Sequence, residues 1–296
     1  GGLAQEIYEG PSRNPSTRGE IEYRDILEAY TAAVVSAAGW QRGRELVMTI
    51  EGPSAVRDVF ARLGPIAPDH NFAVRFDADG DRVAFFEVGV QIPADFIYLL
   101  LAEKLELHPL VLDLRFSRTV RERLDARGVP HMISRVGHLA LTQVMHQSRA
   151  AFGGELSGHY YWREFGGLEC PELTALLVYD IVQRSGRHLS ELVAPYRTMA
   201  KSDEISLPVQ DQAHASVVIE RLATQFSDGA LSRLDGLTVE FEDWWFNIRP
   251  SNTEAVLRLV IEAATQKLLD QRMAEVMSLA TEAPSDRAPH RDSSKQ

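Results

Sequence analysis

Residues 75–85, RFDADGDRVAF, place three aspartates at alternate positions between two short apolar segments. Like charges that close repel one another, so a positive group is expected among them. Alternate residues of an extended chain point to the same side, and carboxylate oxygens favour hard cations such as Mg²⁺ or Ca²⁺. The spacing therefore predicts a divalent cation held by Asp77, Asp79 and Asp81.

This stretch has two other interpretations. The first is an exposed turn that only joins the strands NFAVRF and RVAFFEV. The second is an EF-hand loop, but counting from Asp77 its sixth position is Arg82 instead of Gly and its twelfth is Val88 instead of Glu. Because a guanidinium beside Mg²⁺ helps to neutralise a phosphoryl group, Arg82 favours phosphate chemistry.

A second stretch, GGELSGHYYW at residues 153–162, sets polar side chains among glycines. Glu155, Ser157 and His159 offer the mixed donors and acceptors that sugar hydroxyls need. The alternative is an ordinary loop after a strand, and the neighbouring aromatic residues are expected to pack in the core.

A third stretch, NIRPSNTEAVLRL at residues 247–259, ends in a strand-like segment. Arg249 offers a two-pronged donor, and Ser251, Asn252 and Thr253 add short donors beside it, which predicts a phosphate pocket. The alternative is a capped turn without a ligand.

Composition narrows the function classes. The 296 residues carry a net charge of −11 and a pI of about 5.3, which argues against nucleic acid as the main partner. No apolar run is long enough to cross a membrane. A single cysteine, Cys170, excludes an intrachain disulfide and fits a reducing compartment, so we expect a cytoplasmic location.

Helical periodicity alternates with short apolar strands along most of the chain, which predicts α/β architecture with ligand loops at the carboxyl ends of mostly parallel strands. The expected organisation is two mixed α/β sheet domains, the first of which looks incomplete, followed by a smaller α+β domain. The expected boundaries are residues 1–15 (a remnant), 16–92, 93–200, 201–280 and a disordered tail, 281–296.

The motifs FDADGDR, GELSGH and RPSNTE, in that order, resemble the metal, sugar and phosphate loops of the α-D-phosphohexomutases. Leu156 and the segment SNTE make the chain most similar to the phosphomannomutase/phosphoglucomutase branch. The resemblance runs from about residue 5 to residue 280.

This resemblance implies an enzyme that interconverts hexose 1-phosphates and 6-phosphates of mannose or glucose through a phosphoserine and a bisphosphorylated sugar. It implies Mg²⁺ on Asp77, Asp79 and Asp81, and Arg82 near the phosphoserine. The implied partner is a phosphosugar, held through the residues Glu155, Ser157, His159, Arg249, Ser251, Asn252 and Thr253.

The chain also departs from the family pattern. The family's N-terminal loop T-A-S-H-N-P, which carries the phosphoserine, does not occur, so we expect a fragment that is inactive alone. Ser12 in PSRNP is rejected as a substitute because it lies too near the metal loop. Arg115 replaces a family lysine, and its high pKa makes it a poor proton carrier. His138, in RVGH, becomes the preferred general base.

Two rival functions stay open. A non-catalytic phosphosugar-binding relic would keep the three loops without the donor serine. A metal-dependent phosphatase would have to use Asp77 as its nucleophile and would leave the sugar loop unexplained.

Overall fold

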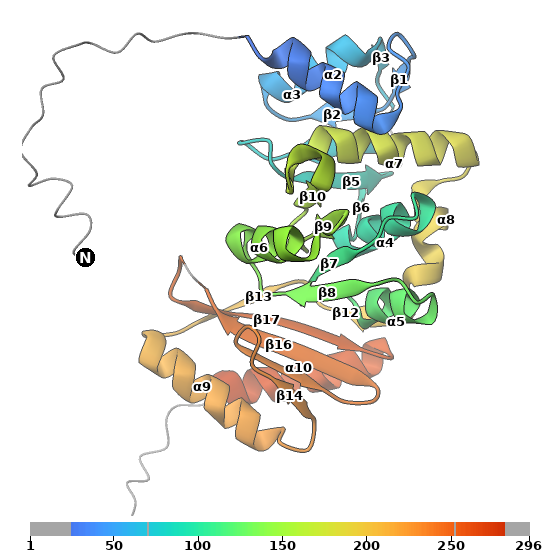
Figure 1. Cartoon of the computed structure of the whole chain (residues 1–296). Helices are drawn as coiled ribbons and strands as arrows, with labels where there is room; N and C mark the ends of the chain where they lie inside the picture. The colour runs from blue at the N-terminus through green and yellow to red at the C-terminus, as the bar shows by residue number, and fades with distance from the viewer. Residues whose placement is uncertain (1–24, 70, 252, 282–296) are drawn as a thin grey trace, which may run out of the picture.

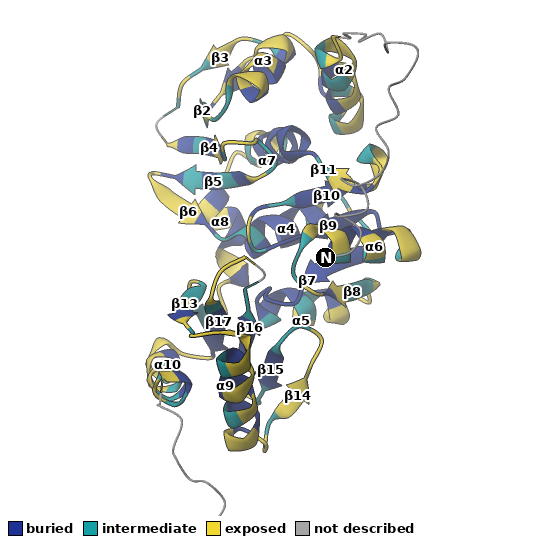
Figure 2. Ribbon diagram, turned by 90° about the vertical axis from the view of Figure 1, so that its left-hand side faces the viewer, coloured by how far each residue is buried: buried dark blue, intermediate teal, exposed yellow. Residues whose placement is uncertain are grey.

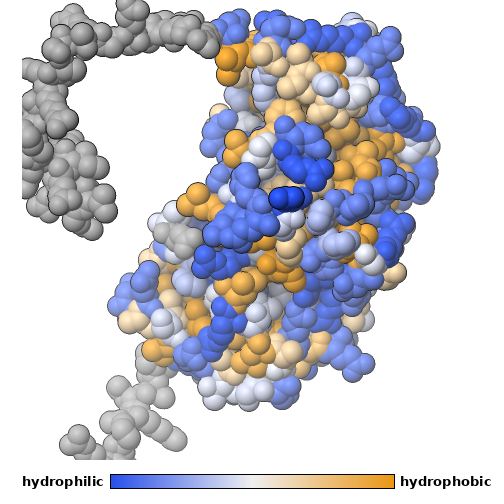
Figure 3. Space-filling model, viewed as in Figure 1, coloured by the Kyte–Doolittle hydropathy of each residue, from blue (hydrophilic) through white to orange (hydrophobic). Residues whose placement is uncertain are grey.

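The computed structural model describes residues 25–69, 71–251 and 253–281. In the described residues, three sheets of four, five and six strands follow one another along the long axis of the molecule, with helices between and beside them and a separate two-stranded sheet near the first (Figure 1). Within the described ranges, no helix has the length and apolar character needed to span a bilayer. Polar and apolar residues are interspersed over the face seen in Figure 3.

The first sheet carries the metal loop. Its strands lie in the order β2-β4-β5-β6, with β2 and β4 parallel and the others antiparallel. Their bounds are Thr49–Glu51 (β2), Phe72–Phe76 (β4), Val83–Glu87 (β5) and Val90–Ile92 (β6). The two strands expected around the aspartates are therefore confirmed as a hairpin.

The apolar segment ELVMTI, residues 45–50, predicts a single buried strand, and this prediction is wrong. The segment divides into β1 (Leu46–Val47), which pairs with β3 (Ile66–Ala67) in a separate two-stranded sheet, and β2. Met48 lies between them, fully buried, and its backbone N–H donates to Ala67, so the chain changes sheets at this residue.

Two helices of this region follow their sequence patterns. Helix α2 (Leu27–Ala38) ends where Gly39 adopts a left-handed conformation at φ 59°. Helix α3 (Ser54–Leu63) buries Val56, Val59, Phe60 and Leu63, the spacing of one helical face.

The second sheet has the strand order β11-β10-β9-β7-β8. Strand β7 is parallel to β8 and β9, but β9, β10 and β11 are antiparallel, so the sheet is mixed where mostly parallel strands were expected. The reason is the short sugar loop between β9 and β10, because parallel strands need a longer crossover. The bounds are Leu110–Asp113 (β7), His131–Ser134 (β8), Phe152–Gly154 (β9), Tyr160–Trp162 (β10) and Leu168–Glu169 (β11).

Helices surround this sheet, and all of those below except the short segment Leu189–Val193 lie where the periodicity predicts a helix. They are Ala94–Lys104 (α4), Arg118–Ala126 (α5), His138–Ser148 (α6), Pro171–Ser185 (α7) and the short Leu189–Val193 (α8). Helix α7 contacts α2, α3 and α4 as well as β5 of the first sheet. One core of buried residues consequently runs from Val34 to Tyr196 through both sheets (Figure 2).

The C-terminal sheet is packed around a core of its own. Six strands take the order β12-β17-β16-β15-β14, with β13 also on β17, and α9 and α10 cover one face (Figure 1). The bounds are Ala200–Lys201 (β12), Ile205–Pro208 (β13), Gln212–Gln225 (α9), Ala230–Ser232 (β14), Leu237–Glu240 (β15), Trp244–Pro250 (β16), Val256–Ala263 (β17) and Gln266–Thr281 (α10). The segment PYRTMAKSDE, near residues 195–205, is polar and predicts a linker, but it contains β12, which pairs with β17.

Candidate functional site

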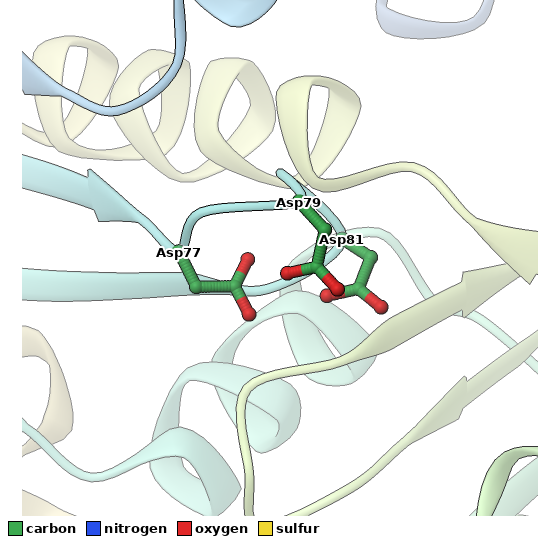
Figure 4. A group of neighbouring side chains, drawn as sticks. All are labelled: Asp77, Asp79 and Asp81. Carbon is green, nitrogen blue, oxygen red and sulfur yellow. The ribbon is translucent and has the colours of Figure 1, made fainter.

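The metal loop joins the carboxyl end of β4 to the start of β5. Asp77 Oδ1 accepts hydrogen bonds from the backbone N–H groups of Gly80 and Arg82, both at 3.2 Å. Gly80 has φ +75°, a conformation that other residues rarely adopt. These bonds curl the loop and gather its acidic side chains on one side (Figure 4).

The three aspartates fit a hard divalent cation. One ligand oxygen from each of Asp77, Asp79 and Asp81 lies within 4.8 Å of the others. Opposite ligands of an octahedral Mg²⁺ are about 4.2 Å apart, so a small side-chain movement would complete the set. Asp81 Oδ1 is buried and has no hydrogen-bond partner among the described residues, which leaves it available as a ligand.

Arg82 connects the metal loop with the sugar loop. Its Nε atom lies 3.3 Å from Asp77 Oδ2 and donates to His159 Nε2 at 3.1 Å. His159 Nε2 also lies 3.5 Å from Asp81 Oδ2. The side chain of Arg82 is half exposed, so part of its guanidinium faces solvent.

Glu155, the first polar residue of the sugar loop, is buried, and both of its carboxylate oxygens have partners. Oε1 accepts from the Gly137 N–H at 2.8 Å, while Oε2 accepts from the Tyr161 hydroxyl at 2.8 Å and lies 3.1 Å from His159 Nδ1. Burial alone would raise the pKa of Glu155, but these hydrogen bonds lower it to about 2. Burial would lower the pKa of His159, but Glu155 and Asp81 raise it.

The sugar loop touches the first sheet at a glycine. Gly158 has φ +93°, its carbonyl accepts from the Val83 N–H at 3.1 Å, and a Cβ there would lie 3.0 Å from the Val83 carbonyl oxygen. Ser157 Oγ lies 2.8 Å from His159 Nδ1. The glycine therefore allows the two loops to approach closely.

Arg115 follows β7 and is held by two carboxylates. Its Nε lies 3.0 Å from both oxygens of Asp113, and Nη1 donates to Glu204 Oε2 at 2.6 Å. Asp113 also accepts from the Leu156 N–H at 3.0 Å, which ties β7 to the sugar loop. Burial would lower the pKa of Arg115, but Asp113 and Glu204 raise it, so this side chain stays charged.

The phosphate loop follows β16. Arg249 is buried, its Nη2 lies 3.3 Å from Glu204 Oε2, and its Nε has no partner in the described part of the chain. Ser251 Oγ accepts weakly from the N–H groups of Thr253 and Glu254, at 3.4 and 3.3 Å. Asn252, also expected here, lies outside the described residues, as does Ser12.

His138 begins α6 next to Gly137, whose N–H binds Glu155. Its Nδ1 lies 2.5 Å from Glu169 Oε1, and 45% of its side chain is exposed. The structure thus places His138 beside the sugar loop, and its role as a base stays a prediction.

A pocket of about 370 Å³ brings the second sheet and the C-terminal domain together. Arg115 and the sugar-loop residues Leu156 and Ser157 belong to its lining, and so does Glu204, which contacts Arg115. The complete lining is Gln91, Pro93, Ala94, Asp95, Arg115, Leu156, Ser157, Lys201, Ser202, Asp203 and Glu204.

Comparison with known proteins assigns the family. Residues 93–199 match the description phosphoglucomutase/phosphomannomutase, alpha/beta/alpha domain III, and residues 200–279 match the C-terminal domain of the same description. The chain belongs to the phosphoglucomutase/phosphomannomutase family. The resemblance inferred from the three motifs is confirmed.

Curated relatives in this family carry mutase names. The phosphomannomutase of Methanocaldococcus jannaschii is 34% identical over 209 residues, which cover 69% of this chain and 46% of that protein. The phosphomannomutase of Escherichia coli K12 is 34% identical over 221 residues, with 72% and 48% covered. The chain spans about half the length of the curated relatives it matches.

Solved structures show the same fold. A phosphoglucomutase/phosphomannomutase family protein from Burkholderia thailandensis has a TM-score of 0.77 at 20% identity, covering 94% of this chain and 68% of that one. A phosphomannomutase-like protein from Thermus thermophilus, with a TM-score of 0.67 at 17% identity, covers 90% and 68%.

Within this phosphoglucomutase/phosphomannomutase family member, sequence reasoning missed four site residues. Asp113 and Glu204 bind Arg115, and Asp95 binds Lys201 at 2.6 Å at the wall of the pocket. A carboxylate that directly ends a buried strand was a usable signal for Asp113. Glu204, Asp95 and Lys201 gave none, because their partners are distant in sequence. Tyr161 is buried as expected, but its hydroxyl also binds Glu155.

Proposed function

We propose that the protein takes part in the interconversion of hexose 1-phosphate and hexose 6-phosphate, with mannose or glucose as the sugar. The observation that carries this proposal is the pocket in which Arg115 and Lys201, each paired with a carboxylate, lie beside the sugar-loop residues Leu156 and Ser157. The names of the curated relatives support it. We place the activity in the cytoplasm, on the basis of the single cysteine.

In this proposal, Asp77, Asp79 and Asp81 would hold Mg²⁺, and the ion would supply positive charge to neutralise a phosphoryl group. Arg82 would approach the same group with the exposed part of its guanidinium. Its bond to His159 keeps it directed toward the sugar loop.

The sugar would lie against the loop of residues 155–159. Glu155 stays ionised at neutral pH because its pKa is about 2, and a carboxylate that already accepts three bonds has room for about one more donor. Ser157 would add a hydroxyl that both donates and accepts. The substrate phosphate would be gripped by Arg249 with Ser251, Asn252 and Thr253.

Proton transfer is assigned to His138. Its Nδ1 contacts Glu169, so Nε2 is the atom proposed to take the proton of the attacking sugar hydroxyl. Arg115 is proposed to act only through its charge. In the full reaction the serine–phosphate bond breaks as the sugar–phosphate bond forms; since T-A-S-H-N-P is not in this sequence, we expect no turnover by these residues alone.

A second candidate is phosphosugar binding without catalysis. The observation that favours it is Arg115, which stands where the family has a proton-carrying lysine and is locked between Asp113 and Glu204. Binding is common to both candidates, whereas turnover belongs only to the first.

The test is a calorimetric titration with mannose 1-phosphate, glucose 1-phosphate and free mannose. We expect the phosphosugars to bind more tightly than mannose, and Arg249→Ala to weaken them about tenfold to a hundredfold, the worth of a charge-assisted hydrogen bond. Arg233→Ala, on the surface of the same domain, is the matched control.

Equal binding by Arg249→Ala and wild type would contradict the proposed phosphate grip. A coupled mutase assay, on this chain and on a fusion that supplies a family phosphoserine domain, separates the two candidates. Turnover by the fusion supports the mutase, and an inert fusion supports the binding protein.

A further inference from the structure

Glu204 lies between β12 and β13, in the segment that enters the C-terminal sheet. A single carboxylate oxygen, Oε2, is 2.6 Å from Arg115 Nη1 and 3.3 Å from Arg249 Nη2. The two arginines come from different sheets, β7 leading to one and β16 carrying the other. Glu204 therefore occupies a position between two cations that an oxygen of a bound phosphate could take.

Arg249 has unused bonding capacity at this position. Its side chain is only 10% exposed, and among the described residues its one ion-pair partner is Glu204, at a long distance. Its Nε–H is buried without an acceptor. A guanidinium carries five N–H donors, so this buried cation can still bind an anion with more oxygens than a carboxylate has.

We propose that Glu204 is an internal competitor for phosphate. Its carboxylate would occupy the position between the arginine pair, Arg115 and Arg249, until a phosphate group displaces it. The proposal rests on the phosphate-binding role proposed above for Arg249. Glu204 would be a specificity-determining residue, since a phosphate with about −1.5 to −2 charge at neutral pH can displace it and a neutral sugar cannot.

The structure offers a place for the displaced side chain. Arg258 Nε lies 3.9 Å from the other oxygen of Glu204, Oε1. Arg258 is also the cross-strand neighbour of Arg249 in the pairing of β16 with β17. Glu204 could thus release Arg249 and remain next to a cation, so displacement would not leave its charge buried and unpaired.

The experiment is calorimetric titration with inorganic phosphate, and then with mannose 1-phosphate and free mannose. The variants are Glu204→Gln, Glu204→Asp and Asp203→Asn. Asp203 lines the same pocket but forms no ion pair within the described ranges, so its variant controls for the loss of one negative charge.

We expect Glu204→Gln to bind phosphate about tenfold more tightly than wild type, because it removes a charge-assisted competitor. Affinity for free mannose should not change. Glu204→Asp has a shorter side chain, so its affinity for phosphate should lie between those of wild type and Glu204→Gln. The phosphate affinity of Asp203→Asn should differ from that of wild type by less than about twofold, the size of effect expected for an exposed charge.

Unchanged or weaker phosphate binding by Glu204→Gln overturns the inference. If Glu204→Gln does not fold, Glu204→Asp decides, since its affinity must exceed that of wild type. The Arg249→Ala variant keeps the two proposals apart. If Arg249→Ala loses phosphate binding but Glu204→Gln does not gain affinity, only the competitor role of Glu204 is rejected. If Arg249→Ala binds phosphate as wild type does, the phosphate-binding role of Arg249 is rejected as well.

Discussion

The metal loop and the arginine pair, Arg115 and Arg249, differ in how their charges are balanced. In the metal loop, three carboxylates gather within reach of one another and one half-exposed arginine, Arg82, accompanies them. At the pocket, Arg115 is almost completely buried and is neutralised by Asp113 and Glu204. The loop is left with an excess of negative charge, but the pocket carries its counter-ions within the chain.

Burial explains the difference. Exposed charges are hydrated and can stay unbalanced at little cost, whereas buried charges need partners. A cluster of side chains with excess charge indicates the sign of the ion that it would bind. A cluster whose charges are neutralised by the protein indicates which side chain a charged ligand must displace.

The largest loss of stability is expected on replacing Arg115, whose charge is neutralised by carboxylates. Arg115→Ala leaves Asp113, whose side chain has no exposed surface, without its cation. We expect the free energy of unfolding to fall by about 3–5 kcal/mol, measured by urea denaturation at neutral pH. Arg115→Lys, which keeps the charge, should lose less. An Arg115→Ala protein as stable as wild type would mean that Asp113 is not held by this ion pair.

A smaller effect is expected at Glu155, which lies between the two regions. Its pKa is about 2 in the folded protein and 4.5 in the reference state, so its stabilising contribution is present above the higher value and is lost as pH falls toward the lower one. The difference corresponds to roughly 3 kcal/mol. Urea denaturation at pH 7 and pH 3 should show wild type losing more stability than Glu155→Gln.

The exposed Glu164 gives the control for this measurement, since Glu164→Gln should follow the wild-type pH dependence. If Glu155→Gln shows the same decline as wild type, the hydrogen bonds from Gly137 and Tyr161 do not stabilise the ionised carboxylate.

The smallest change in stability is expected on replacing an aspartate of the metal loop, where negative charge is in excess. Without metal, Asp79→Asn should leave stability unchanged or raise it slightly, because it removes repulsion. At Mg²⁺ about ten times above its dissociation constant, wild type should gain roughly 1.4 kcal/mol, and Asp79→Asn clearly less. Thermal unfolding with and without Mg²⁺ measures both, with Asp58→Asn on α3 as control. An equal gain in the two variants would contradict the metal assignment.

Local patterns in the sequence predicted most of the elements. The four buried positions of α3 and the hairpin around the aspartates follow directly from apolar spacing. The break at Met48 could not be predicted, because it depends on a hydrogen bond to Ala67 in a distant strand. The antiparallel pairing of β10 with β9 was also not predicted, because it follows from the shortness of the sugar loop and not from composition.

The candidate site divides in the same way. The residues of the three motifs could be proposed from the sequence, since their types and spacing are local, and their roles stay predictions. Glu204 could not, because a glutamate in a polar segment has no distinctive pattern until Arg115 and Arg249 are brought to it. Asp95 and Lys201 are similar, since more than a hundred residues separate them.

Helix α7 has a consequence for the cooperativity of the molecule. Because it contacts β5 of the first sheet, accepts a hydrogen bond at Thr174 from Trp162 of β10 in the second, and shares one core with both, the metal and sugar loops belong to a single unfolding unit. The C-terminal sheet has a separate core, and it is joined to the second sheet by ion pairs such as Arg115–Glu204 and Lys201–Asp95. The position of the phosphate loop relative to the sugar loop is therefore set by paired charges, whereas the metal and sugar loops are held together by shared apolar packing.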